Sequence, residues 1–217
     1  MDTVTAAPNR GIERWGGLGA ILYVVLFIIG NFFLFHGAPD TSSAPAKLTA
    51  WYADSGNQDK VRVGWVLAGL GLFFLIWFVA ALRETVLALG GSFLAAVVAI
   101  GGAIYATLAL AAIAVDMGIR TMSDDTYRHT VYPELIHAAD DAGYTLHATG
   151  GAGAAAMIFA ASIALIRARR SAWLGWFGLL AGLGALFSIA FLPQALVALW
   201  LLAAGALLLS WSRVRTV

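Results

Sequence analysis

Apolar runs of about 20 residues constrain the fold of this chain more than any other feature; charged segments separate all of them except the last two, which Pro193 and Gln194 join. A helix rises about 1.5 Å per residue, so a run of this length crosses a hydrocarbon layer about 30 Å thick. Inside such a layer the backbone must satisfy its own hydrogen bonds, as a helix does. The chain is 61% apolar and 12% charged, whereas a soluble domain is about half apolar and about a quarter charged. The sequence therefore predicts an all-α integral membrane protein.

Six such runs predict a six-transmembrane-helix bundle in one membrane domain covering residues 1–217. The predicted membrane helices cover about residues 18–35, 63–82, 93–115, 144–166, 173–192 and 195–211. Two longer polar segments, 36–62 and 116–143, remain as loops, and helix-start signals in each predict short loop helices. A signal peptide cleaved near Ala46 is an alternative for the first run. An uncleaved helix fits better, because the run is longer than the apolar region of a signal peptide.

The distribution of basic residues predicts the orientation of the bundle. With the N-terminus inside, eight Lys and Arg residues lie on cytoplasmic segments and five on external segments. In membrane proteins the cytoplasmic loops carry the excess of Lys and Arg. We therefore expect both termini in the cytoplasm and both long loops outside, where they would form a cap.

The first outer loop contains signals for one short helix. Ser43 is a candidate N-cap and Gly56 a candidate stop. Between them, Leu48, Trp51 and Tyr52 are spaced to share one face. The favoured interpretation is an interfacial helix whose apolar face rests on lipid headgroups. The alternative is a lid or docking surface above the bundle.

The second outer loop carries a polar stripe that leads into the fourth predicted membrane helix. Pro133 suits the first turn of a helix. At about 100° per residue, the polar side chains that follow share an arc of about 140°. These side chains are Glu134, His137, Asp140, Asp141, Tyr144 and His147. One polar face is thus predicted to run from the outer surface towards the membrane interior.

Part of this stripe has the spacing of metal ligands. Glu134 and His137 are three residues apart, as in helices that bind metal in di-iron bundles, and Asp141 lies one turn further. Imidazole with carboxylate suits zinc, iron or manganese, so these three are candidate ligands of a divalent metal, which Asp116 and His129 could complete. A di-iron centre would need a second such pair, which the sequence lacks. The favoured interpretation is a solvated acidic helix end, and a proton-handling or ligand-binding cluster is the other alternative.

Three further polar residues are candidates for a cluster at this end of the bundle. Asp140 and His147 lie on the polar stripe, and Asp116 follows the third predicted membrane helix. Small residues follow His147 and allow another helix to approach, so we expect His147 to form an interhelical hydrogen bond. Asp116 and Arg120 are four residues apart, which predicts a salt bridge at the rim.

Several classes of function are disfavoured by what the sequence lacks. A net charge of +1 provides no basic excess for binding nucleic acid. The chain has no cysteine, which excludes thiolate metal sites and cysteine nucleophiles. No nucleotide-binding or hydrolase motif occurs. No ionisable residue lies near the middle of a predicted membrane helix, which disfavours an ion-coupled transporter.

Four short motifs lie at or near the ends of predicted helices. They are Ala38-Pro39-Asp40, Ala50-Trp51-Tyr52-Ala53-Asp54, Ala81-Leu82-Arg83 and Trp173-Leu174-Gly175-Trp176. Together they resemble a family of uncharacterised small multi-pass membrane proteins of high-GC, actinobacterial genomes. The resemblance implies a location in the inner cell membrane of a bacterium and carries over no catalytic residues.

The expected function is a non-enzymatic accessory, sensing or ligand-binding component with an extracytoplasmic cap. One alternative is a membrane-embedded, metal-dependent enzyme with an outward-facing carboxylate and histidine site. The other is a small-molecule transporter. The expected partners are the lipid bilayer and a lipid or membrane protein that contacts the cap.

Overall fold

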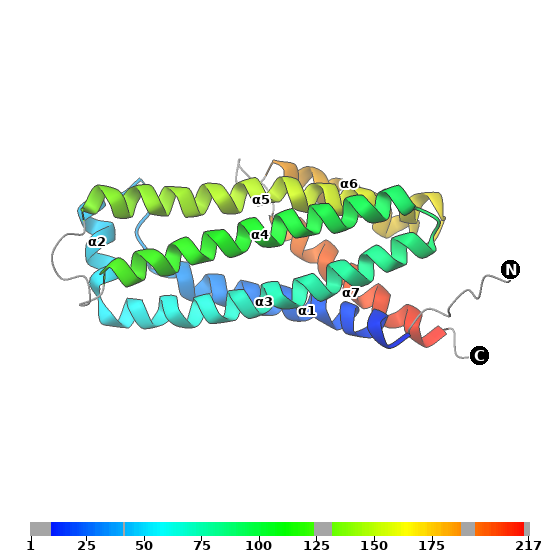
Figure 1. Ribbon diagram of the computed structural model, residues 1–217, viewed down its shortest axis with the longest axis horizontal. Coiled ribbons are helices and arrows are strands. Elements are labelled where there is room, and N and C mark those ends of the chain that lie inside the picture. The colour runs from blue at the N-terminus through cyan, green and yellow to red at the C-terminus, as the bar shows by residue number, and fades with distance from the viewer. Residues whose placement is uncertain (1–9, 41, 124–131, 188–193, 215–217) are drawn as a thin grey trace, which may run out of the picture.

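The computed structural model describes residues 10–40, 42–123, 132–187 and 194–214, and within these ranges the protein is all-helical. Seven helices follow one another along the described chain (Figure 1). They are α1 (Arg10–Phe35), α2 (Pro45–Ala53), α3 (Ser55–Ala88), α4 (Ser92–Ser123), α5 (Pro133–Arg167), α6 (Ala172–Leu186) and α7 (Gln194–Val214). The predicted all-α fold is confirmed.

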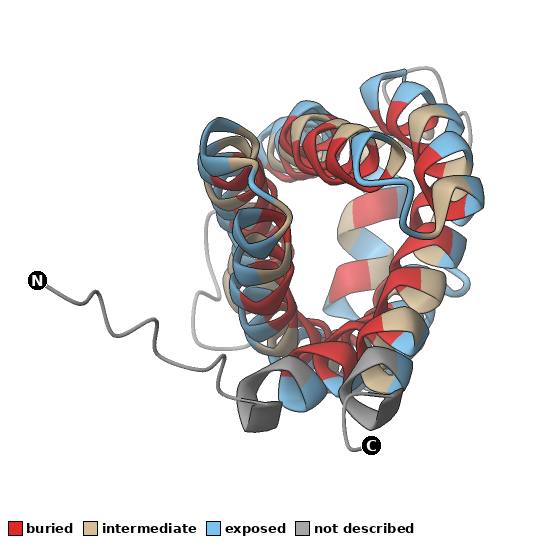
Figure 2. Ribbon diagram, turned by 90° about the vertical axis from the view of Figure 1, so that its right-hand side faces the viewer, coloured by how far each residue is buried: buried red, intermediate tan, exposed pale blue. Residues whose placement is uncertain are grey.

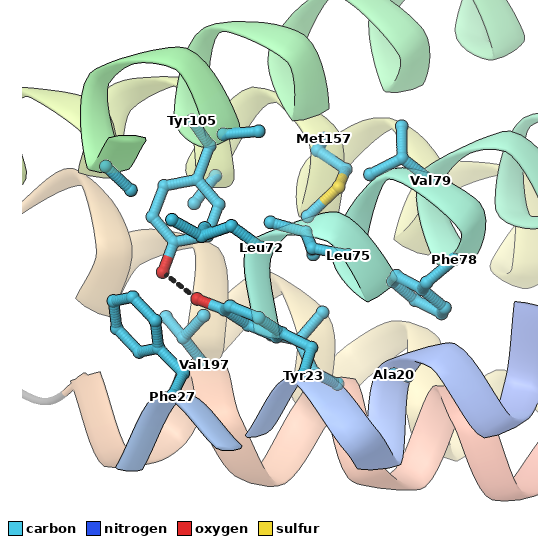
Figure 3. Close-up of a cluster of buried hydrophobic side chains, with 14 of the residues drawn as sticks. Ala20, Tyr23, Phe27, Leu72, Leu75, Phe78, Val79, Tyr105, Met157 and Val197 are labelled. Carbon is cyan, nitrogen blue, oxygen red and sulfur yellow. Dashed lines mark hydrogen bonds between the residues drawn. The ribbon is translucent and has the colours of Figure 1, made fainter. Parts of the chain in front are cut away.

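All helices except α2 form a closed ring. Helix α1 packs against α3 and α7, α4 packs against α3 and α5, and α6 packs against α5 and α7. The view along the long axis shows this ring, with buried residues on its inner side and exposed residues outside (Figure 2). Apolar side chains fill much of the interior, among them Leu72, Phe78 and Met157, which are fully buried (Figure 3).

The helices of the ring differ greatly in length. Helices α3, α4 and α5 have 34, 32 and 35 residues, whereas α6 has 15. Helix α2 lies across one end of the long helices, here termed the α2 end, and α6 and α7 lie beside the opposite half (Figure 1). Residues 55–62 and 116–123, predicted to be loop, extend α3 and α4 at the α2 end, so the predicted helix boundaries are wrong there. Helix α5 begins at Pro133, as the helix-start signal in the sequence predicts.

Four helices, α1, α3, α4 and α5, are long and apolar enough to cross a membrane. Large apolar side chains lie on the outer surfaces of α1, α3 and α4, where Phe32, Phe73 and Ile100 are each more than half exposed. Continuous apolar surface of this kind is unfavourable in water and favourable against lipid tails. Helices α6 and α7 are shorter apolar helices. Residues 188–192 of the fifth predicted membrane helix lie outside the described part of the chain.

Glycines bring the helices of the ring into close contact. A Cβ atom added to Gly101 of α4 would lie 2.6 Å from the carbonyl oxygen of Gly153 on α5. One added to Gly153 would lie 2.7 Å from the carbonyl oxygen of Gly101. At Gly30, where α1 meets α3, an added Cβ atom would lie 2.7 Å from the backbone nitrogen of Ala68. Residues without side chains are therefore needed where these backbones approach each other.

The boundaries of α2 differ from those that the sequence predicts. It begins at Pro45, and Ala44 occupies the N-cap position in place of Ser43. It ends at Ala53 because the side chain of Asp54 caps the next helix by accepting a hydrogen bond from the Asn57 nitrogen at 3.0 Å. Gly56 therefore lies within α3 and does not end a helix.

The apolar face of α2 packs on the bundle. Leu48 and Tyr52 are only 1% and 2% exposed, and α2 contacts α3, α4 and α5. The expectation that this face rests on lipid headgroups is wrong, because the extended ends of the long helices cover it.

Candidate functional site

A cavity of about 510 Å³ lies at the α2 end of the ring. It is bounded by α1 and the segment that follows it, by α4 and α5, and by the first residue of α7. Helix α7 starts beside the middle of α5, so it does not extend to the α2 end (Figure 1). We term this space the Asp116 cavity. Its polar lining consists of Asn31, Asp40, Asp116, Asp140, Tyr144, His147 and Gln194.

Asp116 of α4 is a buried acidic side chain that lines this cavity, with only 6% of its surface exposed. It faces α5, since a Cβ atom at Gly143 would lie 3.3 Å from its Oδ1 atom. Within the described ranges this carboxylate has no hydrogen-bond or ion-pair partner. A buried carboxylate without a partner is energetically costly. Asp116 is therefore the strongest indication of a functional site.

The predicted salt bridge between Asp116 and Arg120 is not formed. Arg120 is also 6% exposed, but its Nε atom donates a hydrogen bond to the carbonyl oxygen of Gln58 on α3 at 2.9 Å. The side chain of Asp116 instead lies against Gly143 of α5. The two side chains are thus oriented towards different neighbouring helices, Arg120 towards α3 and Asp116 towards α5.

Asp140 of α5 is held by a residue of α2. The Tyr52 hydroxyl donates a hydrogen bond to the Asp140 Oδ1 atom at 3.3 Å. Burial, together with the negative charges of Asp140 and Asp116, raises the pKa of the Tyr52 phenol. The hydroxyl therefore keeps its proton and remains a donor, which fixes both α2 and Asp140 beside the cavity.

His147 of α5 lies between the Asp116 cavity and a second, smaller cavity, because it lines both, as does Gln194. Its Nε2 atom is 3.4 Å from the Oε1 atom of Gln194 on α7. Its ring stacks on Phe27 of α1, with 5.7 Å between the ring centres and 11° between the planes. The predicted interhelical hydrogen bond of His147 is therefore present.

The second cavity, of about 180 Å³, is lined mainly by apolar side chains. Tyr23 of α1 and Tyr105 of α4 also line it, and their hydroxyl oxygens are 2.6 Å apart (Figure 3). The contact between these two tyrosines is not among the predictions from the sequence. The sequence feature that could indicate it is a tyrosine within an apolar run, because a buried tyrosine hydroxyl needs a hydrogen-bond partner. Polar side chains thus continue from the Asp116 cavity into the interior of the ring.

The structure divides the polar stripe predicted on α5. Asp140, Tyr144 and His147 line the Asp116 cavity, whereas Glu134 and Asp141 are exposed on the surface. An arc of about 140° is wide enough to face both a cavity and solvent. The cluster of Asp116, Asp140 and His147 is brought together on one cavity, and Glu134 is not part of it.

The candidate metal ligands show one close contact. His137 Nε2 lies 3.7 Å from the Asp141 Oδ2 atom. In the part of the chain that the structure describes, no group of three His, Asp or Glu side chains is arranged to hold a metal ion. His129 lies outside the described residues. A metal bound by Glu134, His137 and Asp141 stays a prediction.

The fold and the site together define an all-α protein with four helices able to cross a membrane and an acidic cavity at one end. Comparisons with known protein families, with curated proteins and with solved structures find no match to this chain. A function must therefore be inferred from the geometry of the cavities.

Proposed function

We propose that this protein is a six-span protein of the bacterial inner membrane that binds a small ligand in the Asp116 cavity. In this proposal the six helices of the ring cross the membrane, both termini are cytoplasmic, and the α2 end faces outwards. The protein acts as a non-enzymatic accessory or sensing component. The observation that carries the proposal is the buried Asp116 carboxylate, which lines a cavity and has no partner among the described residues.

Three observations support six crossings. Helices α6 and α7 complete the ring between α5 and α1, so they are packed as the longer helices are (Figure 2). Their outer surfaces are also apolar, since Trp176, Leu183 and Leu199 are 63%, 48% and 54% exposed. Helix α7, with 21 residues, is about 30 Å long, close to the thickness of a hydrocarbon layer.

The Asp116 cavity has the properties of a ligand site. Its volume of about 510 Å³ lies within the range of about 300–1,000 Å³ that is typical of small-molecule sites. Polar groups converge on it from α1, α4, α5 and α7. The hydrogen bond from Tyr52 holds Asp140 in place before any ligand arrives. Such preorganisation lowers the cost of binding.

Cysteine labelling tests whether the cavity opens outwards, because the chain has no native cysteine. Ala112 and Ala109 of α4 are both buried, with 4% and 1% exposure, but only Ala112 lines the cavity. We expect a membrane-impermeant thiol reagent, added from outside, to label Ala112→Cys and not the matched Ala109→Cys. Equal labelling of both variants, or no labelling of folded Ala112→Cys, would contradict the proposal.

Ligand binding is tested with a mixture of small fragments and saturation-transfer NMR on purified Ala112→Cys protein. Fragments that bind in the cavity should lose their signal after the introduced thiol is modified with a bulky maleimide. The same treatment of Ala109→Cys should leave their signals unchanged. If no fragment binds, or if the modification displaces none of them, the proposed binding function is wrong.

Reporter fusions test the number of crossings. Reporters at the N-terminus and at the C-terminus should both indicate the cytoplasm, because six crossings return the chain to its starting side. A C-terminal reporter that indicates the periplasm would overturn the six-span topology.

A further inference from the structure

We propose further that the ligand of the Asp116 cavity is a small organic cation whose ammonium group binds between Asp116 and Asp140. This inference rests on the proposed function, since it names the chemical class of ligand for the same cavity. The rest of the ligand would contact the apolar part of the wall, which includes Phe35, Ala112 and Ile113.

The first argument is the charge of the cavity. Asp40, Asp116 and Asp140 line it, and none of its described lining residues is Lys or Arg. Asp140 lies close enough to Asp116 for the two negative charges to repel each other. Arg120, one turn from Asp116, donates its hydrogen bond to α3 instead. Two carboxylates that face one cavity repel each other, and a bound cation removes that repulsion.

The second argument is the state of Asp116. It is 6% exposed and has neither a hydrogen bond nor an ion pair with another part of the described chain. An ionised carboxylate can only accept hydrogen bonds. An ammonium group provides three donors, which is enough to reach Asp116 and Asp140 together. A positively charged donor would therefore satisfy Asp116 and offset the charges of both carboxylates.

The third argument separates an organic cation from a bare metal ion. Calcium takes about six to eight oxygen ligands, and magnesium requires a nearly octahedral set. The described residues contain no group of three His, Asp or Glu side chains arranged around an ion. The cavity wall instead includes the aromatic rings of Phe35 and Tyr144, and aromatic faces attract organic cations. The cavity volume also leaves room for an apolar group beside the ammonium.

Three probes that share a phenylethyl group test the charge of the ligand. They are phenethylammonium, 2-phenylethanol and 3-phenylpropanoate, titrated into the full-length protein in detergent by calorimetry. We expect saturable binding of phenethylammonium alone. Asp116→Asn and Asp140→Asn should each weaken it about tenfold or more, because each removes a charged hydrogen-bond acceptor.

The matched control is Asp59→Asn on α3, which removes the same charge at an exposed position. Asp59 lies 3.6 Å from Arg62 and does not line the cavity, so its replacement should leave phenethylammonium binding unchanged. Thermal unfolding shows whether each variant is folded. If Asp116→Asn does not fold, Asp116→Glu provides a second test, because it keeps the charge and should still bind phenethylammonium and not 2-phenylethanol.

The results distinguish this inference from the proposed function. One contrary result is that the neutral or the anionic probe binds as tightly as phenethylammonium. The other is that folded Asp116→Asn and Asp140→Asn both bind phenethylammonium with the wild-type affinity. Either result would show that the ligand is not a cation held by these carboxylates. The proposed function still stands in that case if fragments are displaced by modification at residue 112. If neither the probes nor the fragments bind, both proposals fail.

Ammonium groups occur on lipid headgroups as well as on free amines, and nanodiscs separate these two sources. A weaker apparent affinity for phenethylammonium in phosphatidylethanolamine than in phosphatidylcholine, which has the same net charge but no N–H donor, would identify the headgroup as a competitor for the cavity. Equal affinities in the two lipids would favour a free amine as the ligand. Both results support an ammonium ligand and differ only in where it comes from.

Discussion

The α2 end and the opposite half of the ring share the same long helices but are packed in different ways. In the half beside α6 and α7, glycines such as Gly101 and Gly153 bring backbones together, and fully buried side chains such as Trp200 fill the interior. At the α2 end, α3, α4 and α5 extend beyond the start of α7, and α1, α4 and α5 supply most of the lining of the Asp116 cavity. The comparison shows that the larger, polar cavity lies at the start of α7, whereas only a smaller and mainly apolar cavity lies beside α6 and α7.

The largest effect is expected from Gly101→Ala in the tightly packed half. The added Cβ atom would lie 2.6 Å from the Gly153 carbonyl oxygen and 2.7 Å from the Met157 nitrogen, and backbone atoms cannot turn aside. We expect a loss of about 3 kcal/mol in the free energy of unfolding, measured by thermal or denaturant unfolding in detergent.

The control for this prediction is Gly118→Ala on the same helix. No atom lies within 4 Å of a Cβ atom added there, so the change should be neutral or stabilise the helix by up to about 1 kcal/mol. If the two variants unfold at the same temperature, the two halves of the ring do not differ in packing.

The next largest effect is expected from Asp116→Asn at the α2 end, and it has the opposite sign. A neutral amide is less costly to bury than an unpaired carboxylate, so the ligand-free protein should gain about 1–2 kcal/mol of stability. Chemical unfolding measures the gain, and exposed Asp59→Asn should change stability by less than about 0.5 kcal/mol. A loss of stability in Asp116→Asn would mean that this carboxylate supports the fold, as the glycines do in the other half.

A smaller effect is expected from Tyr52→Phe, which removes the hydroxyl that joins α2 to Asp140. The 3.3 Å hydrogen bond should contribute about 1 kcal/mol to stability, and ligand affinity should fall because Asp140 loses its position. Tyr132→Phe is the control, since Tyr132 is 65% exposed. Equal stability and equal affinity of the two variants would show that α2 does not organise the cavity.

The smallest effect is expected from His137→Ala. The 3.7 Å contact between His137 and the half-exposed Asp141 should contribute less than about 0.5 kcal/mol, and binding in the Asp116 cavity should not change. The metal content of wild-type protein purified without a histidine tag is the decisive comparison. A near-stoichiometric metal that is lost in His137→Ala would instead support the metal site of Glu134, His137 and Asp141.

The fold class follows from the sequence because long apolar runs admit few structures other than helices. The helix ends do not follow, as residues 55–62 and 116–123 show. Hydropathy marks where a segment can contact lipid, whereas a helix continues as long as neighbouring elements pack against it. Polar residues at these ends are compatible with both a loop and a helix, and the packing of α2 against them favours the helix.

Part of the site also follows from sequence spacing. Asp140 and His147 can be assigned to one polar face, and Asp116 to the neighbouring helix end, but spacing does not show which part of a face meets a cavity. Tyr52 could not be predicted as the partner of Asp140, because 88 residues separate the two. Spacing also predicts the wrong partner for Arg120, because its hydrogen-bond acceptor, the Gln58 carbonyl oxygen, lies on a different helix 62 residues away in the sequence.

The contact between α7 and α1 closes the ring between its first and last helices along the chain. Gln194, at the start of α7, also supplies the partner of His147 and separates the two cavities. During biosynthesis the helices emerge from the ribosome in chain order, so α1 to α6 are made before α7. A nascent chain that ends at α6 therefore has an incomplete cavity, with one side of His147 uncovered. Under the proposed function, the complete binding site exists only once α7 has packed against α1 and α6, so ligand binding would report on completed assembly.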